Sequence, residues 1–147
     1  MSTNAICAIA TAKGSSALGI IRISGADLKT MLSHIFTKEL LDRKAILTDI
    51  KKDKILFDNC IVILYSAPKS YTGEDVIEII THGNPIIMNS VIDLLCSLGI
   101  SHAGPGEFTE RAFMNNKITL EKAEAIADLI SASDIQAVRA AQNSLTG

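Results

Sequence analysis

Polar and apolar positions alternate in short runs along the first two-thirds of the chain, and this pattern predicts β-strands joined by turns. The runs are rich in Ile, Val and Leu, and residues that favour turns separate them. A turn-rich connector, Ala67–Glu74, precedes the last run. The expected strands are Ala5–Ala10, Leu18–Ser24, Ala45–Ile50, Cys60–Ser66 and Asp75–Thr81.

Helical periodicity is brief at Asp27–Phe36 and becomes dominant from Pro85 onward. Pro85 is expected to open a helix, because apolar residues then recur with helical spacing, and Gly99 is the expected stop. Thr119 is a suitable N-cap for the next helix, and a last helix with a face of small residues follows a break at Ser131–Asp134. The expected fold class is therefore α+β, with a mixed β-sheet, flanking helices and the start of a helical region at the C-terminus.

Composition and charge agree with a compact domain. The chain has 147 residues, of which 48% are hydrophobic, enough for a sizeable core. Its net charge of −2 gives no general attraction to nucleic acid or to an acidic membrane. The basic residues of Lys38–Lys54 are interleaved with acidic ones, which favours a solvated, half-neutralised surface over an RNA footprint.

The sequence offers no motif for a metal centre, a disulfide framework or a nucleotide P-loop. Cys7, Cys60 and Cys96 are far apart and odd in number, as is typical of a protein in a reducing cytoplasm. Gly99 and Gly104 have P-loop spacing, but the required Lys and Ser/Thr do not follow. The apolar runs are strand-sized and the first residues lack a signal-peptide pattern, so we expect a cytoplasmic protein without membrane spans.

Two charged residues interrupt apolar strand faces. Arg22 shares its predicted face with Ile20, and Glu78 shares its face with Ile80. A charge buried in a sheet is costly unless it is paired or ligated. One interpretation is that the two residues lie on a solvated face or pair with each other. The other is that Arg22 supplies a cation, and Glu78 a two-oxygen acceptor, for a bound polar molecule.

The segment Ala103–Lys117 combines a Pro-Gly turn with charged residues. Glu107 is expected in the first turn of a short helix, where Arg111 lies four residues further on and can pair with it. The sequence "MNNK" predicts a second turn with Lys117 at its tip, where an ordinary surface lysine is the simpler interpretation. His82 ends a predicted strand, where a surface or capping role competes with that of a catalytic base.

Four segments together resemble one known family. In order and spacing, "GIIRISG", "SYTGEDVIEIITHG", "PGEFTERAFMNNK" and "AEAIADLISA" resemble the N-terminal domain of the MnmE (TrmE) family of tRNA-modification GTPases. The resemblance implies an α+β domain related to the folate-binding domain of aminomethyltransferases. It implies folate binding and dimerisation for residues 1–118, and a helical segment, 119–147, that leads into a further helical domain.

The resemblance also implies the ligand and the residues that contact it. The family's folate-contacting Arg, Glu and Lys fall on Arg22, Glu78 and Lys117. The ligand would be a tetrahydrofolate derivative, either 5-formyl-tetrahydrofolate or 5,10-methylene-tetrahydrofolate. A cation suits the anionic glutamate tail of folate, and a carboxylate can accept from the N–H donors of the pterin edge. We assign no catalytic residue and no metal ligand in this chain.

The complete proteins of the family imply a wider context. They form homodimers, carry a G domain for GTP, potassium and magnesium, and modify the wobble uridine of tRNA with a flavin-dependent partner of the MnmG (GidA) type. This chain is expected to lack the G domain. Two other classes stay open: a stand-alone one-carbon (aminomethyl) transferase and a purely structural dimerisation module.

The chain departs from the family's usual pattern in two loops. The segment "AKGSS", Ala12–Ser16, stands where the family usually has a Pro-Pro-Gly-x-Gly-like loop. Asn84 stands where a second Gly usually follows His-Gly. Both loops adjoin strands that are expected to contact the ligand, so these residues bear on the affinity for folate.

Overall fold

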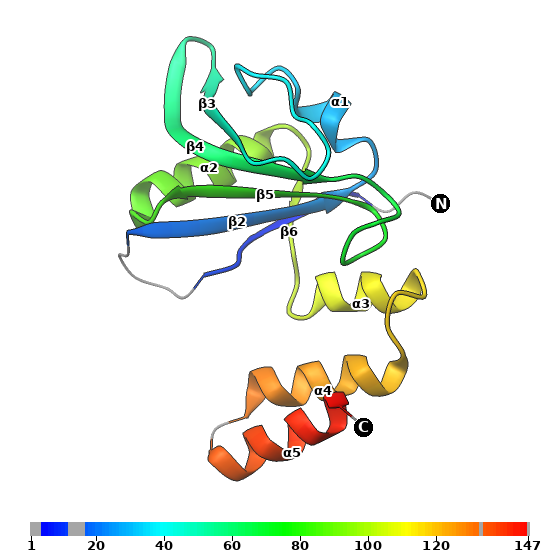
Figure 1. The fold of residues 1–147 in the computed structure, drawn as a ribbon. Coiled ribbons are helices and arrows are strands. Elements are labelled where there is room, and N and C mark those ends of the chain that lie inside the picture. The colour runs from blue at the N-terminus through cyan, green and yellow to red at the C-terminus, as the bar shows by residue number, and fades with distance from the viewer. Residues whose placement is uncertain (1–3, 12–16, 133, 147) are drawn as a thin grey trace. The chain divides into compact units, whose positions relative to one another are not determined.

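The computed structural model describes residues 4–11, 17–132 and 134–146, so the loop Ala12–Ser16 lies outside the described residues (Figure 1). The chain forms two compact units. The first contains Met1–Ser70 and Glu74–Ala103, and the second contains Tyr71–Gly73 and Gly104–Gly147.

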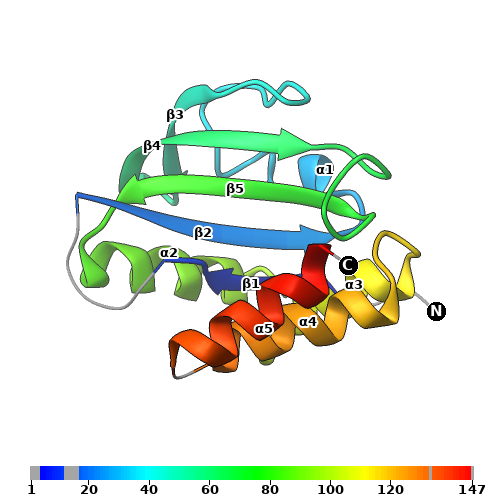
Figure 2. The same ribbon diagram turned by 60° about the horizontal axis from the view of Figure 1, so that its bottom comes forward.

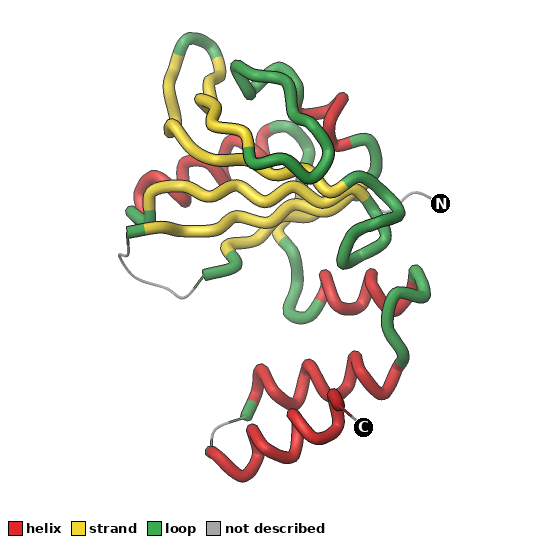
Figure 3. Tube along the Cα trace, in the orientation of Figure 1, coloured by secondary structure: helices red, strands yellow, loops and turns green. Residues whose placement is uncertain are grey.

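The first unit is built on a mixed six-stranded sheet, which confirms the expected α+β class (Figure 3). Its order is β3-β4-β5-β2-β1-β6, and β1 pairs in parallel with β6 while the other neighbours are antiparallel. The strands are β1 (Ile6–Ile9), β2 (Leu18–Gly25), β3 (Ile46–Lys52), β4 (Ile55–Tyr65), β5 (Asp75–His82) and β6 (Ser101–His102).

The hairpin of β3 and β4 is longer than the sequence pattern predicts. Lys52 pairs with Ile55, so only Asp53 and Lys54 form the turn. Both turn residues have positive φ, 52° and 66°, as a type I′ hairpin turn requires. A β-bulge after Ile50 shifts the register near this turn and interrupts the alternation on which strand prediction depends.

Helix α1 (Leu28–Leu32) is shorter than the predicted helix Asp27–Phe36. The chain leaves the helix because the following residues pair with the edge strand β3 instead. The backbone N–H of Lys51 donates to the carbonyl of Ile35 at 2.8 Å, and Phe36 forms a β-bridge with Ile50.

Helix α2 (Pro85–Ser97) covers one face of the sheet together with α1 (Figure 1, Figure 2). Alternate residues of the strands point toward these helices and are almost completely buried. The main members of this core are Cys7, Ile21, Ile23, Leu28, Leu32, Cys60, Val62, Leu64, Ile77, Ile79, Val91 and Leu95. The remaining strand residues face the opposite side, which we call the open face.

The second unit contains helices α3 (Glu107–Met114), α4 (Leu120–Ser131) and α5 (Ile135–Thr146). Thr119 caps α4 as predicted, because its hydroxyl accepts from the backbone N–H of Lys122 at 3.2 Å. Among the described residues, every helix is too short or too polar to cross a membrane.

Candidate functional site

Arg22 and Glu78 lie directly opposite each other on β2 and β5. The Arg22 Nη2 atom is 3.0 Å from the Glu78 Oε2 atom, and the exposed fractions of the two side chains are 35% and 22%. The two charges that interrupt the alternation therefore form a half-buried ion pair on the open face. This confirms the interpretation that they pair with each other.

The ion pair extends into a longer polar chain through Tyr65 at the end of β4. The Tyr65 side chain lies near the Glu78 carboxylate. Burial raises the pKa of Tyr65, and the negative charge of Glu78 raises this pKa further. The guanidinium of Arg43 lies over the Tyr65 ring, 5.5 Å from its centroid. The order of the polar chain is therefore Arg43, Tyr65, Glu78 and Arg22.

The acidic residues of "TGED" hold the loop that precedes β5. Asp75 accepts from two backbone N–H groups, that of Ala67 at 2.8 Å and that of Leu28 at 3.2 Å. The second contact caps α1 from a distance, because Asp27 at its N-cap position makes no side-chain cap. Glu74 accepts from the buried hydroxyl of Ser24 at 2.8 Å. The carboxylates of these two residues therefore act as structural acceptors in this unit.

The glycine that ends "GIIRISG" is required by a close approach between strands. A Cβ atom at Gly25 would lie 2.6 Å from the Cβ and 2.9 Å from the Cα of Ala5. Those distances are too short for any side chain, so a larger residue would push β1 away from β2. This motif residue supports the sheet beside Arg22.

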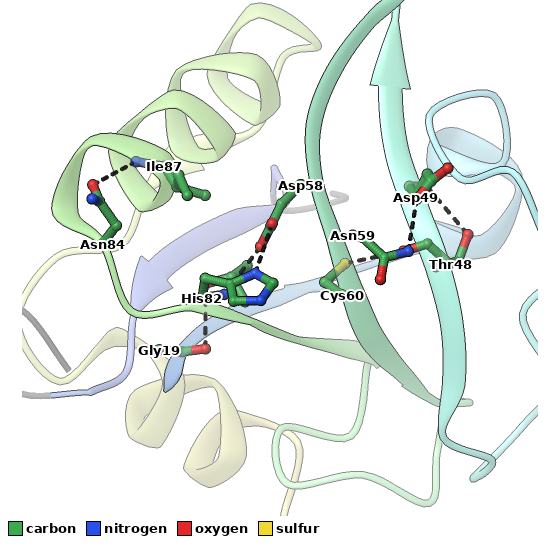
Figure 4. Close-up of polar contacts among 10 residues, drawn as sticks. Gly19, Thr48, Asp49, Asp58, Asn59, Cys60, His82, Asn84 and Ile87 are labelled. Carbon is green, nitrogen blue, oxygen red and sulfur yellow. Dashed lines mark hydrogen bonds and ion pairs between the residues drawn. The ribbon is translucent and has the colours of Figure 1, made fainter. Parts of the chain in front are cut away.

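His82, at the end of β5, is held by a buried carboxylate (Figure 4). Asp58 is 8% exposed, and its Oδ2 atom accepts from the backbone N–H of His82 at 3.0 Å. Its Oδ1 atom lies 2.9 Å from the His82 Nδ1 atom, and the His82 side chain is 65% exposed. Asp58 thus fixes both the strand end and the ring orientation.

Asn84 caps helix α2 (Figure 4). Its Oδ1 atom accepts from the backbone N–H groups of Ile86 at 2.8 Å and Ile87 at 3.4 Å. The φ angle of Asn84 is −78°, a conformation that any L-residue adopts. Asn84 therefore satisfies helix N–H groups in a relaxed backbone.

In the second unit, Glu107 organises the start of α3. Its Oε1 atom accepts from the backbone N–H of Gly104 at 2.8 Å, and its Oε2 atom lies 3.2 Å from the Arg111 Nη2 atom. The predicted i,i+4 pair is thus confirmed. Arg111 is 8% exposed, so this pair is more buried than a typical surface pair.

Lys117 follows a turn that is joined to the segment Tyr71–Gly73. The Asn115 side-chain amide donates to the carbonyl of Thr72 at 2.7 Å. Gly73 has a φ of 83°, and a Cβ atom there would lie 2.9 Å from the Cβ of Asn115. The backbone N–H of Lys117 donates to the carbonyl of Ala112 at 2.8 Å, and its side chain is exposed. Two of the quoted motifs therefore meet within this unit.

The structure brings Arg22 and Glu78 together in the first unit and places Lys117 in the second. Sequence reasoning missed Tyr65 and Asp58. Tyr65 is the last residue of an apolar strand. The hydroxyl of its side chain was the feature of the sequence that could have marked it as part of a polar site. Asp58 falls in a part of β4 that the pattern did not assign to a strand.

Metal ligation finds no support among the residues that the structure describes, because no three His, Cys, Asp or Glu side chains gather there. Burial is the main reason that the pKa values of the Cys7 and Cys60 thiols are raised to about 12. Both thiols are therefore protonated at neutral pH and make poor metal ligands.

Comparison with known proteins adds an independent line of evidence. A family model described as GTP-binding protein TrmE N-terminus matches residues 5–117. The chain is 48% identical over 142 residues to the tRNA modification GTPase MnmE of Francisella tularensis subsp. novicida (strain U112), covering 97% of this chain and 32% of that protein. The protein of the same name from Francisella philomiragia subsp. philomiragia (strain ATCC 25017) is 46% identical, with the same shares covered.

The chain spans about a third of the length of the curated relatives that it matches. The family model covers both β2 and β5 with the Arg22–Glu78 pair, and it extends to the turn before α4 that carries Lys117. From this match, and from the high identity along nearly the whole chain, we conclude that the protein belongs to the TrmE N-terminal family.

Proposed function

We propose that this chain binds a tetrahydrofolate derivative through Arg22, Glu78 and Lys117, and that it does so as a homodimer. The observation that carries the proposal is the half-buried Arg22–Glu78 pair on the open face of the sheet. Lys117 enters through the family resemblance, and the proposal does not depend on any particular distance between it and the pair.

Energetics favour a ligand-binding role for this pair over a purely structural one. Exposed ion pairs contribute only about 0–1 kcal/mol to stability. Replacing buried pairs by apolar residues of similar volume is often neutral or stabilising by about 1–4 kcal/mol. In register with Glu78 and Arg22, the flanking strands carry Ile63 and Ala8, so an apolar pair would suit the face. Stability alone therefore gives no reason for charges at these two positions.

The chemistry of the pair suits the pterin end of a reduced folate. A carboxylate has two oxygens and about four acceptor sites, and the contact with Arg22 leaves Glu78 able to accept from further donors. Adjacent N–H groups of a pterin edge match such a carboxylate in a two-point contact. A cation at Lys117 suits the anionic glutamate tail. Which end of the folate meets each residue is part of the proposal.

Homodimerisation is supported by an apolar row that crosses four strands of the open face. By register, Leu47 pairs with Ile61, Ile61 with Ile80, and Ile80 with Ile20. Leu47 is 55% exposed and Ile61 is 38% exposed. Contiguous exposed aliphatic residues on a sheet face are typical of an interaction surface. A second copy would cover them in a closed, self-complementary interface.

The role in the cell would be that of the N-terminal part of a tRNA-modifying GTPase. The named relatives are tRNA modification GTPases, and they are about three times as long as this chain. The chain would hold the one-carbon donor for modification of a wobble uridine. GTP, potassium and magnesium would bind only to a G domain, and a flavin-dependent protein of the MnmG type would be the partner. The boundary between a folate-binding domain, residues 1–118, and a helical segment, residues 119–147, is also part of this proposal.

Calorimetric titration of the chain with 5-formyl-tetrahydrofolate tests the proposal directly. We expect saturable binding, with no turnover of the one-carbon unit and no hydrolysis of added GTP. Turnover would favour the stand-alone transferase. A folded dimer that binds no folate would favour the structural module and would contradict the ligand proposal.

A further inference from the structure

The tip of the β3–β4 hairpin forms a basic hollow within the first unit. Its cavity of about 330 Å³ is lined by His34, Lys51, Lys52, Asp53 and Lys54. All of these residues except the half-buried Lys52 are exposed. We call His34, Lys51, Lys52 and Lys54 the hairpin cluster.

A tight turn and a backbone hydrogen bond hold the chain around the hairpin cluster. The two-residue turn Asp53–Lys54 has the left-handed conformation that fits the twist of a hairpin. The bond from the Lys51 N–H to the Ile35 carbonyl fixes the neighbouring segment, and this brings His34 beside the hairpin. The cationic groups are therefore carried by hydrogen-bonded backbone.

Three of the four acidic residues that are interleaved with basic ones in Lys38–Lys54 do not line the hollow. Asp42 accepts from the backbone N–H of Ser66 at 2.8 Å, and Asp49 accepts from the side-chain amide of Asn59 at 2.7 Å. Glu39 pairs with Lys29 at 3.4 Å. Glu39, Asp42 and Asp49 are thus held by partners outside the lining of the hollow.

Within the described residues, the ammonium groups of Lys51, Lys52 and Lys54 form no ion pair or hydrogen bond. Of the described residues, only Asp53 brings an acidic side chain to the lining of this hollow. Several unpaired lysines around one hollow repel each other, and an anion relieves that repulsion. The cluster therefore has an excess of positive charge without a partner inside the described chain.

We propose that the hairpin cluster binds the phosphate backbone of RNA, with tRNA as its partner. Lysines supply sequence-independent phosphate contacts, which position a nucleic acid without reading its bases. The choice of RNA over other polyanions rests on the proposed function, because the relatives are named for tRNA modification. The site lies at the hairpin tip, and it uses none of the three residues proposed to contact folate.

The test is a fluorescence anisotropy titration of the chain with an unmodified tRNA transcript across a series of salt concentrations. The double variant Lys51→Gln/Lys54→Gln should weaken binding roughly tenfold and reduce the slope of log K against log salt by about two. The matched control is Lys122→Gln/Arg139→Gln, which removes the same charge from the helices of the second unit and should leave the slope unchanged.

A variant that makes the hollow more positive completes the experiment. Asp53→Asn removes the acidic residue from the hollow, and Asn accepts the positive φ of this position readily, so binding should become several-fold tighter. Asp128→Asn removes one negative charge from α4, the same change in net charge, and should have no such effect. Equal responses of cluster and control variants would overturn the proposal.

Two further outcomes would also overturn it. One is the absence of tRNA binding by the unmodified chain at low salt. The other is a preference of the cluster for vesicles of phosphatidylserine and phosphatidylcholine over tRNA. Folate titration of the same variants separates this proposal from the preceding one, because cluster variants should keep the affinity for 5-formyl-tetrahydrofolate. A chain that binds tRNA but no folate would contradict only the proposed function.

Discussion

The Glu78 carboxylate accepts from the Arg22 guanidinium at 3.0 Å, and its negative charge helps to raise the pKa of the nearby Tyr65. Arg22 and Tyr65 come from strands on opposite sides of β5. This arrangement orients the carboxylate before any ligand arrives. A preoriented acceptor reduces the ordering that binding requires, and so it raises affinity without adding contacts.

The first prediction concerns Glu78→Gln. The substitution keeps the shape of the side chain but replaces one acceptor oxygen by an N–H₂ donor, which opposes the pterin donors and Arg22. We expect the affinity for 5-formyl-tetrahydrofolate to fall by about 1.5–3 kcal/mol, as for a hydrogen bond to a charged group. Calorimetry measures the loss. Glu39→Gln, at the exposed pair with Lys29, is the control, and an unchanged affinity in folded Glu78→Gln would remove Glu78 from the site.

The second prediction concerns the apolar row of the open face. Ile61→Lys places a charge at the centre of the proposed interface, where burial of an unpaired ammonium is costly. We expect a dimer-to-monomer shift in analytical ultracentrifugation at micromolar concentration. Ile86→Lys, at a position on α2 that is 77% exposed, should remain dimeric. A monomeric unmodified chain would contradict the dimer outright.

The third prediction is a pH dependence that arises from Tyr65. Its pKa is raised in the folded chain, so the folded state favours the neutral hydroxyl. The corresponding stability is complete below the unfolded-state pKa of about 10 and is lost as pH rises through the higher folded-state pKa. We expect the unfolding free energy, measured with denaturant, to fall more steeply with pH in this alkaline range than in Tyr65→Phe. Parallel curves would show that Tyr65 is not responsible.

The fourth prediction concerns the cap of α2. Asn84→Ala removes the acceptor for two helix N–H groups and should lower the unfolding free energy by about 1 kcal/mol. Asn84→Gly should cost only a few tenths of a kcal/mol, since Gly also tolerates the N-cap position. Thermal unfolding of both variants gives the comparison. An equal loss in both would contradict the capping role.

Alternation along the strands was enough to identify the fold class and to single out Arg22 and Glu78. It was also enough to list their mutual pairing as one of the open interpretations. It did not identify Tyr65 as the third member, because that requires the register between β4 and β5, and register is not encoded in the period of a single strand.

The sequence pattern missed the tip of the β3–β4 hairpin for a local reason. The run of Lys51–Lys54 reads as a charged loop, and the bulge after Ile50 breaks the period of two where β4 begins. Asp58 was missed for the same reason. The sequence did not reveal the hairpin cluster either, because counting along the chain assigns each acid to its neighbours, whereas in the fold Asp42 and Asp49 do not line the hollow.

The discontinuous second unit limits how this protein can be recombined with its relatives. Tyr71–Gly73 belongs to that unit although it lies within the sequence of the first. A chimaera with a single junction after Ala103 would therefore take Thr72 from one parent and Asn115 from the other. The hydrogen bond between the Asn115 side chain and the Thr72 carbonyl would then link segments of different parents. An exchange that preserves the bond needs three junctions, one on each side of the short segment and one after Ala103. The "SYTG" and "MNNK" motifs are thus transferable only as a pair.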